Sequence, residues 1–237
     1  MKQLYTEIVQ AKATGKQLLA ILLDPEKIKV EDIPLWAKRI NQSPATHLLV
    51  GGSSFEGSHL DDMICELKKG ISLPILLFPG HYNQISTEAD GILFLQLLSG
   101  RNPDYLIEHQ IQAVPLLEST DLEVISTGYI LIESGHETAV ARVSKTQPLS
   151  HTDFDYVAQT AKAGEYMGNA LVYLEAGSGA SQAVPLEMIS TVTQRITIPI
   201  LVGGGIRSSK AIAAAYEAGA TMVVIGTAFE QNLHFFD

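Results

Sequence analysis

Short apolar runs alternate with longer amphipathic segments along this 237-residue sequence, and this alternation constrains the fold more than any other feature. Continuous runs of Leu, Ile and Val are typical of strands buried on both faces, as in a parallel sheet whose crossovers are helices. We expect strands at 18–23, 47–50, 75–78, 91–95, 125–132, 171–174, 200–202 and 222–225. About eight βα units predict an α/β protein, a TIM-type (β/α)₈ barrel.

The amphipathic segments between these runs predict helices at 33–41, 59–69, 104–113, 153–167, 185–195 and 208–218. Asp153 and Ser208 have the side chains of N-caps, and Gly219 follows its helix as a stop signal. Residues 79–89 are rich in Pro, Gly, His and Asn, so the third βα unit is expected to be irregular, and 134–150 is expected to be an extended loop. Because no low-complexity linker divides the chain, residues 1–237 are expected to form one domain.

The composition excludes some classes of protein. A net charge of −10 argues against a broad nucleic-acid surface, although a few backbone N–H groups can still hold a small anionic ligand. Cys65 is the only cysteine, so no internal disulfide can form. Residues 1–16 lack the pattern of a signal peptide, and the longest apolar runs fall short of the roughly 20 residues that span a bilayer. These features predict a cytoplasmic protein and are compatible with transient contact with a membrane surface.

Glycine-rich segments follow the last three predicted strands: Tyr-Leu-Glu-Ala-Gly-Ser-Gly at 173–179, Val-Gly-Gly-Gly-Ile at 202–206 and Ile-Gly-Thr at 225–227. In a barrel the loops after successive strands lie side by side at the carboxyl end. Glycine there lets backbone N–H groups approach phosphate oxygens, and the following helix N-termini favour negative charge. One such segment often marks only a tight turn, but three in succession favour a phosphate site.

Two carboxylates lie at predicted strand ends. Asp24 follows the first strand and can either bind Mg²⁺, which prefers oxygen ligands, or cap the next turn. Ser53, after the second strand, can add an oxygen ligand, although such a serine is more often a turn residue. Glu175 lies two residues after Tyr173, so both side chains point to the same side of the strand end. Glu175 can act as a general base or form a structural ion pair.

Taken together, these segments resemble the geranylgeranylglyceryl phosphate synthase family, which includes the bacterial heptaprenylglyceryl phosphate synthases. The resemblance runs through nearly the whole chain and is closest to the archaeal and Bacteroidetes-type group. Its most specific part is the Tyr-Leu-Glu-Ala-Gly-Ser-Gly segment combined with Leu-Asp-Pro-Glu-Lys at 23–27. It also includes Gly-Gly-Ser-Ser at 51–54, Phe-Pro-Gly at 78–80, Val-Gly-Gly-Gly-Ile-Arg at 202–207 and Gly-Thr at 226–227.

The resemblance implies transfer of a prenyl group, geranylgeranyl in the first place, from its diphosphate to the 3-hydroxyl of sn-glycerol 1-phosphate. It implies that Asp24 and Ser53 bind Mg²⁺ at the leaving diphosphate and that Glu175 accepts the hydroxyl proton. The implied glycerol phosphate site consists of Tyr173, Leu174, Glu175, Ala176, Gly177, Ser178, Gly179, Gly203, Gly204, Gly205, Gly226 and Thr227. A homo-oligomer, dimeric or hexameric, is also implied. For the prenyl tail, residues 93–98 and those near Tyr129 are candidates for an apolar groove.

Two other functions are compatible with glycine-rich barrel loops: another phosphate-binding barrel enzyme, such as a phosphosugar isomerase, and a non-catalytic barrel that binds a phospholigand. The isomerase leaves the segments around Asp24 and Glu175 without a combined role, and the presence of both carboxylates counts against the non-catalytic barrel.

Overall fold

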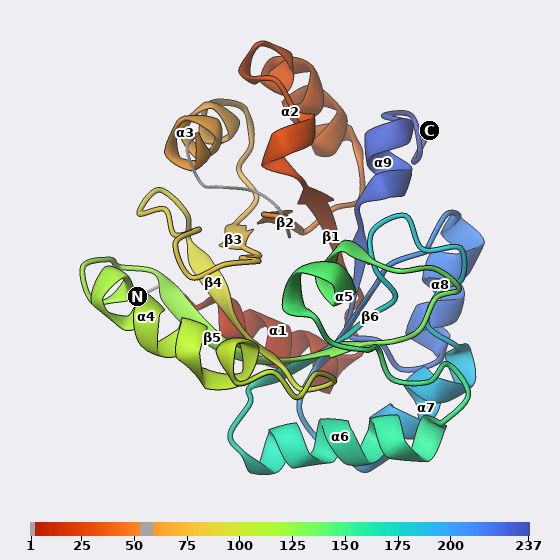
Figure 1. Cartoon of the computed structure of the whole chain (residues 1–237). Helices are drawn as coiled ribbons and strands as arrows, with labels where there is room; N and C mark the ends of the chain where they lie inside the picture. Colours follow the sequence, from red (N-terminus) through yellow and green to blue (C-terminus); the bar gives the residue numbers. More distant parts are fainter. Residues whose placement is uncertain (1–2, 53–58) are drawn as a thin grey trace.

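Eight parallel strands pair in sequence order, and β8 pairs with β1 to close a barrel (Figure 1). The computed structural model describes residues 3–52 and 59–237. The strands are β1 (Leu18–Leu23), β2 (His47–Val50), β3 (Ile75–Leu77), β4 (Gly91–Leu97), β5 (Glu123–Leu131), β6 (Leu171–Glu175), β7 (Ile200–Gly203) and β8 (Met222–Ile225). The predicted (β/α)₈ barrel is therefore confirmed.

Alternation along each strand divides the apolar side chains between two cores. In β1, Leu18 and Ala20 point into the barrel, whereas Leu19 and Ile21 pack outward against the helices. Because both faces of the sheet are covered, every residue of the strand except Leu22 is buried, which explains the continuous apolar run in the sequence. Leu22, near the carboxyl end, faces a cavity at the barrel mouth.

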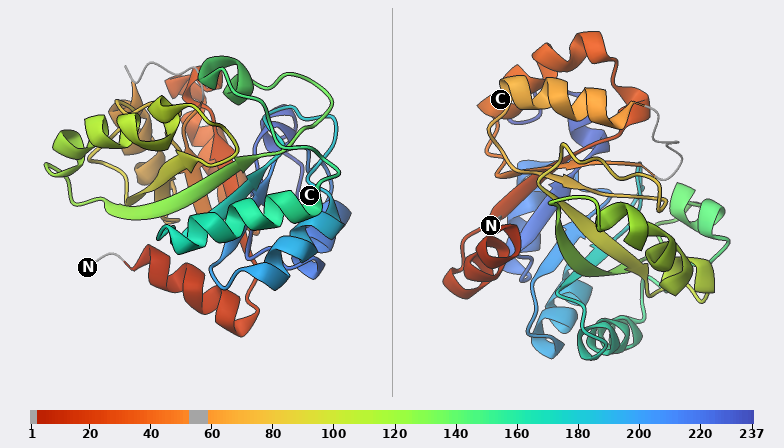
Figure 2. Two further views of the ribbon diagram at one scale, coloured as in Figure 1. Left: turned by 60° about the horizontal axis from the view of Figure 1, so that its bottom comes forward. Right: turned by 90° about the vertical axis from the view of Figure 1, so that its left-hand side faces the viewer.

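Helices surround the barrel (Figures 1 and 2). They include α2 (Ile33–Gln42), α3 (Leu60–Gly70), α4 (His109–Leu117), α6 (Phe154–Tyr166), α7 (Leu186–Arg195) and α8 (Ser209–Glu217). As predicted, Asp153 and Ser208 are N-caps: each side chain accepts a backbone N–H bond of 3.1 Å. The predicted helix at 104–113 begins with a π-helical turn, η3 (Asp104–Glu108), before α4. Within the described residues, no helix is both long enough and apolar enough to cross a bilayer.

The third βα unit is irregular, as the sequence predicts. No helix occurs between β3 and β4, where residues 78–90 are all described. The side chain of Gln84 holds this segment to the neighbouring loop by accepting from the Gly80 N–H at 2.8 Å and donating to the Gly52 carbonyl at 3.2 Å. The backbone around Phe78 can therefore lie close to the end of β2.

The expectation of an extended loop at 134–150 is wrong, because the segment contains a helix, α5 (Ala139–Ser144). Thr138 caps it by accepting from the Ala141 N–H at 3.2 Å. The β-branched residues of Thr-Ala-Val-Ala-Arg-Val have low helix propensity, so the sequence pattern does not predict a helix here. Burial of Ala141 and Ser144 overrides that propensity. Another short helix, α9 (Thr227–Gln231), follows β8.

The opposite end of the barrel is closed by α1 (Leu4–Thr14), which Figure 2 shows on the far side from α5. Leu4, Ile8 and Ala11 are buried in the inner core. Glu123, the first residue of β5, accepts the backbone N–H groups of Leu4 at 2.8 Å and Tyr5 at 2.9 Å. A carboxylate at this position satisfies two N–H groups of the first turn and complements the helix dipole.

We predict that Glu123→Ala lowers the free energy of unfolding by about 1–3 kcal/mol, because two charge-assisted hydrogen bonds are lost. Chemical denaturation measures the change. Glu7→Ala, which removes an exposed carboxylate from the same helix, is the matched control and should have little effect. Equal stability of Glu123→Ala and the unsubstituted protein would show that Glu123 does not anchor α1.

Candidate active site at the mouth of the barrel

A polar cavity of about 310 Å³ lies at the carboxyl ends of the strands. The loops after β1, β6, β7 and β8 form its walls, and α5 contributes Ala139 and Val140. Most of the predicted site residues line it: Asp24, Tyr173, Glu175, Gly177, Ser178, Gly179, Gly204, Gly205, Gly226 and Thr227. Segments separated by some 200 residues in the sequence thus share one cavity.

Other predicted site residues lie elsewhere. The side chains of Leu174 and Ala176 point outward into the core beneath the helices and do not line the cavity. Gly203 also lies outside the lining, packed against the end of β6. Ser53 lies outside the described residues, so its predicted role as a metal ligand stays a prediction.

The glycines at the end of β7 allow Glu175 to lie against the backbone. A Cβ atom on Gly203 would lie 2.3 Å from the Tyr173 hydroxyl and 2.8 Å from Glu175 Oε2. At Gly204, whose φ is +80°, a Cβ would lie 2.4 Å from Glu175 Oε1 and 2.6 Å from the Gly177 nitrogen. The glycine run is therefore required both by the backbone conformation and by close packing.

Glu175 has the properties of a proton acceptor. It is buried at the end of β6, and its Oε1 accepts the Gly177 N–H at 2.6 Å. Burial raises the pKa of this carboxyl to about 7, although the Tyr173 hydroxyl and the Gly177 N–H partly oppose the shift. The Tyr173 hydroxyl is itself buried and makes no regular hydrogen bond with the described residues. A carboxyl with a pKa near neutrality is well matched to general base catalysis at physiological pH.

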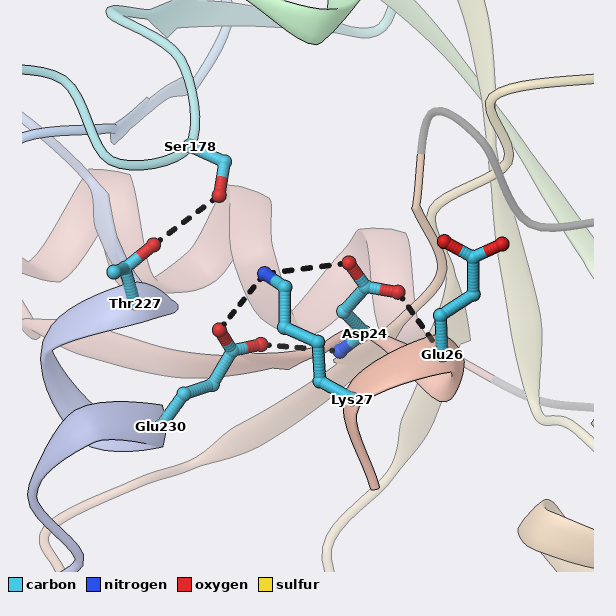
Figure 3. A network of polar contacts seen from close by, with 6 residues as sticks. All are labelled: Asp24, Glu26, Lys27, Ser178, Thr227 and Glu230. Carbon is cyan, nitrogen blue, oxygen red and sulfur yellow. Dashed lines mark hydrogen bonds and ion pairs between the residues drawn. The ribbon is translucent and has the colours of Figure 1, made fainter. Parts of the chain in front are cut away.

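Asp24 lines the same cavity, and Figure 3 shows its contacts with Glu26 and Lys27. Its Oδ1 accepts the Glu26 N–H at 3.1 Å, so the predicted turn cap is present, and its Oδ2 lies 3.3 Å from Lys27 Nζ. Because the ammonium group of Lys27 already occupies a cation position at this carboxylate, the position also suits Mg²⁺. Among the described residues no three His, Cys, Asp or Glu side chains form a metal cluster. Mg²⁺ is usually bound by one or two carboxylates together with substrate phosphates, so a single carboxylate such as Asp24 is compatible with it.

A second cavity, of about 90 Å³, is mostly apolar and is lined by residues such as Leu95, Leu97, Tyr105, Ala113 and Val143. It includes part of the predicted groove at 93–98. Gly52, Phe78, Tyr129 and Val140 line both cavities. The rings of Phe78, Tyr129 and Tyr173 lie 5.4–6.0 Å apart, centroid to centroid, at this boundary. An apolar site and a polar site therefore meet at an aromatic wall.

Four charged residues of the polar cavity were not singled out from the sequence: Glu26, Lys27, Arg207 and Glu230. Lys27 and Arg207 belong to the motifs around Asp24 and Gly203–Gly205, so their positions in the sequence provided a signal. The Arg207 guanidinium donates to the carbonyls of Gly179 at 3.4 Å and Ala180 at 2.9 Å. Glu230 lies on α9, for which no helix was predicted, and no spacing in the sequence connects it with Asp24.

The fold and the cavity define a (β/α)₈ barrel with the glycine-lined mouth typical of phosphate-binding barrels. The chain belongs to the PcrB family, whose model matches residues 12–236. A relative from Flavobacterium johnsoniae named geranylgeranylglyceryl phosphate synthase is 60% identical over 234 residues, which cover 99% of this chain and 96% of the relative. One of the same name from Korarchaeum cryptofilum is 38% identical over 217 residues, covering 92% of this chain and 89% of the relative.

Among solved structures, the chain is similar to (S)-3-O-geranylgeranylglyceryl phosphate synthase from Thermoplasma acidophilum in complex with its substrate sn-glycerol-1-phosphate. The TM-score is 0.93 at 30% sequence identity, and the match covers 100% of this chain and 95% of the other. The resemblance to this family inferred from the motifs is thereby confirmed, including both its bacterial and its archaeal members.

If this cavity binds glycerol phosphate, as the related Thermoplasma acidophilum protein does, we predict that Gly204→Ala weakens that binding by about tenfold or more, because a displaced Glu175 and a shifted loop cost at least one charge-assisted hydrogen bond. Isothermal titration calorimetry measures this affinity. Gly15→Ala is the matched control: its φ is +71°, but a Cβ there meets no atom within 4 Å. Gly15→Ala should destabilise the fold by a similar amount through its left-handed backbone conformation, but it should not lower the affinity. Unchanged affinity in Gly204→Ala would contradict the packing argument.

Proposed function

We propose that this protein transfers a prenyl group, geranylgeranyl in the first place, from its diphosphate to the 3-hydroxyl of sn-glycerol 1-phosphate. The observation that carries this proposal is the aromatic wall shared by an apolar cavity and a polar cavity that contains Glu175. The relatives named for this reaction support it, as does the related structure bound to sn-glycerol-1-phosphate. A phosphosugar isomerase would have no use for the apolar cavity.

The loops after β6, β7 and β8 would bind the phosphate of the acceptor. Ser178 and Thr227 come from different loops, and their hydroxyl oxygens lie 3.1 Å apart on the cavity wall (Figure 3). Both hydroxyls can donate to a phosphate oxygen, as can exposed N–H groups of the glycine backbone. Arg207 also lines the cavity and donates hydrogen bonds to the Gly179 and Ala180 carbonyls of the loop after β6.

Glu175 would accept the proton of the acceptor hydroxyl while the new ether bond forms. The C1–O bond to diphosphate breaks, a bond from C1 to the glycerol 3-oxygen forms, and the hydroxyl proton passes to Glu175. Tyr173 would orient the acceptor through its hydroxyl, which is buried on the cavity wall. Holding the acceptor oxygen beside both groups contributes by proximity as well as by proton transfer.

The donor would place its tail in the apolar cavity and its reacting carbon at the aromatic wall. Breaking an allylic C–O bond leaves positive charge on the prenyl carbon, and the faces of aromatic rings attract positive charge. Phe78 and Tyr129 line both cavities, so their rings lie where the two substrates would meet.

We also propose that Mg²⁺ assists departure of the diphosphate. The carboxylate of Asp24 would hold the ion, and the family resemblance adds Ser53. When bound, Mg²⁺ neutralises the charge that develops on the leaving group. The proposed homo-oligomer, dimeric or hexameric, and the proposed cytoplasmic location rest on the resemblance and on the composition.

The proposed reaction is tested by measuring diphosphate release from geranylgeranyl diphosphate with Mg²⁺ present. We expect release with sn-glycerol 1-phosphate and little with its 3-phosphate enantiomer, because a proton acceptor and a phosphate site fixed on the barrel select one hydroxyl. A chelator should abolish release, and added Mg²⁺ should restore it. No release with either enantiomer, even with longer and shorter donors, would rule out prenyl transfer.

Glu175→Gln should lower turnover by about 10²–10⁴-fold, the usual contribution of a general base. In the unsubstituted protein, kcat/KM for the acceptor should rise with pH through about 7, because the carboxyl must lose its proton first. Glu175→Gln should lose this dependence. The exposed Glu133, just beyond β5, provides the control Glu133→Gln. Equal turnover by Glu175→Gln with normal acceptor binding would exclude Glu175 as the base.

The stability of the fold should fall as pH rises, whereas the activity should increase. The pKa of Glu175 is about 7 in the folded protein and 4.5 ordinarily, so the fold favours the protonated form. Its stabilising contribution is complete below pH 4.5 and is lost as pH rises to about 7. Glu175→Gln should remove this loss and be at least as stable as the unsubstituted protein at pH 8. Thermal unfolding at several pH values measures the effect.

A further inference from the structure

Lys27 is held between two carboxylates that come from opposite ends of the chain (Figure 3). Its Nζ lies 2.9 Å from Oε2 of Glu230, on α9, and 3.3 Å from Oδ2 of Asp24, at the end of β1. The other oxygen of Glu230, Oε1, accepts the backbone N–H of Asp24 at 3.3 Å. Glu230 therefore contacts both the ammonium group and the backbone of the residue proposed to hold Mg²⁺.

The described lining of the polar cavity contains four carboxylates, Asp24, Glu26, Glu175 and Glu230, but only two cationic side chains, Lys27 and Arg207. Arg207 is bonded to the loop after β6, beside the proposed glycerol phosphate site. Lys27 is therefore the protein cation on the Asp24 side, where the proposed reaction releases diphosphate.

Glu230 and Lys27 differ in how freely their side chains can move. The side chain of Glu230 is only 9% exposed, whereas that of Lys27 is 45% exposed. α9 is also tied to the phosphate loops, since the Thr227 hydroxyl meets that of Ser178. We therefore expect the Glu230 carboxylate to stay in place. The ammonium group of Lys27 can move away from Asp24 while it remains paired with Glu230.

Resting on the proposed function, we propose that Lys27 binds the leaving diphosphate directly and that Glu230 is the positioning residue that holds Lys27 beside the metal-binding carboxylate. In the free protein Lys27 competes with a metal ion for Asp24. When metal and diphosphate bind, Lys27 stays on Glu230 and turns from the Asp24 oxygen to a diphosphate oxygen. The residue thus prevents two carboxylates from facing each other unpaired and then becomes a second cation for the leaving group.

This arrangement makes Lys27→Met act in opposite directions on two ligands. The affinity of the substrate-free protein for Mg²⁺ or Mn²⁺ should rise severalfold, because the competing cation is gone. Affinity for inorganic diphosphate, measured in the presence of Mg²⁺, should fall by about tenfold, as expected when a hydrogen bond between charged groups is lost. A purely structural role for Lys27 would weaken both.

Calorimetric titration of the full chain with Mn²⁺ alone, and with inorganic diphosphate plus Mg²⁺, measures these effects. Lys29→Met is the matched control, since Lys29 lies two residues away, is 77% exposed and does not line the cavity. Lys27→Arg, which keeps the charge, should recover most of the diphosphate affinity. Binding of sn-glycerol 1-phosphate should stay within twofold in all three variants and shows that each is folded.

The variant Glu230→Gln tests whether Glu230 positions Lys27 through the charge of its carboxylate. The amide oxygen can still accept the Asp24 N–H, but the ion pair with Lys27 is lost, so Lys27 pairs with Asp24 alone. Metal affinity and diphosphate affinity should both fall, and KM should rise for the prenyl donor while KM for the acceptor is unchanged. A fall in acceptor binding of the same size would indicate general disruption of α9 and would contradict the positioning role.

The outcomes distinguish this inference from the proposed function. If the unsubstituted protein neither binds diphosphate nor releases it from a prenyl donor, the proposed function fails and the role of Lys27 with it. If it transfers prenyl groups and Lys27→Met binds diphosphate as well as the unsubstituted protein does, only the role of Lys27 is wrong. Weaker diphosphate binding with unchanged metal affinity would overturn the competition for Asp24.

Discussion

The close packing of β6 against the glycine-rich end of β7 is the constraint on which the candidate site depends. Gly203 and Gly204 leave no room for a Cβ, because the Tyr173 hydroxyl and both oxygens of Glu175 occupy that space. The same contact removes Glu175 from water and raises the pKa of its carboxyl. One feature of the backbone thus positions the proposed base, favours its protonated form and fixes the path of the loop after β7. A side chain at either glycine would disturb all three.

A consequence of barrel architecture is that two cavities of different polarity can share a wall. The missing helix of the third unit lets Phe78 come close to β2, and the capped helix α5 adds apolar side chains above both cavities. Aromatic rings suit such a boundary, because their faces tolerate hydrocarbon on one side and positive charge on the other. The irregular third unit and α5 therefore complete an apolar site whose other walls are β4 and α4.

The sequence was sufficient to predict the strands and to place the loop glycines, Asp24 and Glu175 at the barrel mouth, because strand burial and carboxyl-end loops follow from local pattern and barrel topology. The side chains of Leu174 and Ala176 face the outer core, because alternate side chains of an extended segment point away from the cavity. Their predicted part in substrate binding would therefore have to come from the backbone. Helix α5 was missed because burial, not propensity, stabilises it. Glu230 could not be found, since its contact with Asp24 spans 206 positions and depends on how the last helix packs.

The net charge of −10 makes the local placement of cations decisive for a protein proposed to bind two anionic substrates. At physiological ionic strength charges are screened over about 8 Å, so groups inside the cavity matter more than the total charge. A phosphate arriving near Glu175 raises the pKa of that carboxyl further, which would keep the proposed base protonated. Backbone N–H groups and Arg207 on the acceptor side oppose that shift, and Lys27 with a metal ion offsets the diphosphate. In the proposed reaction, the cations that bind the two anionic substrates would therefore also help to keep the proposed base ionised.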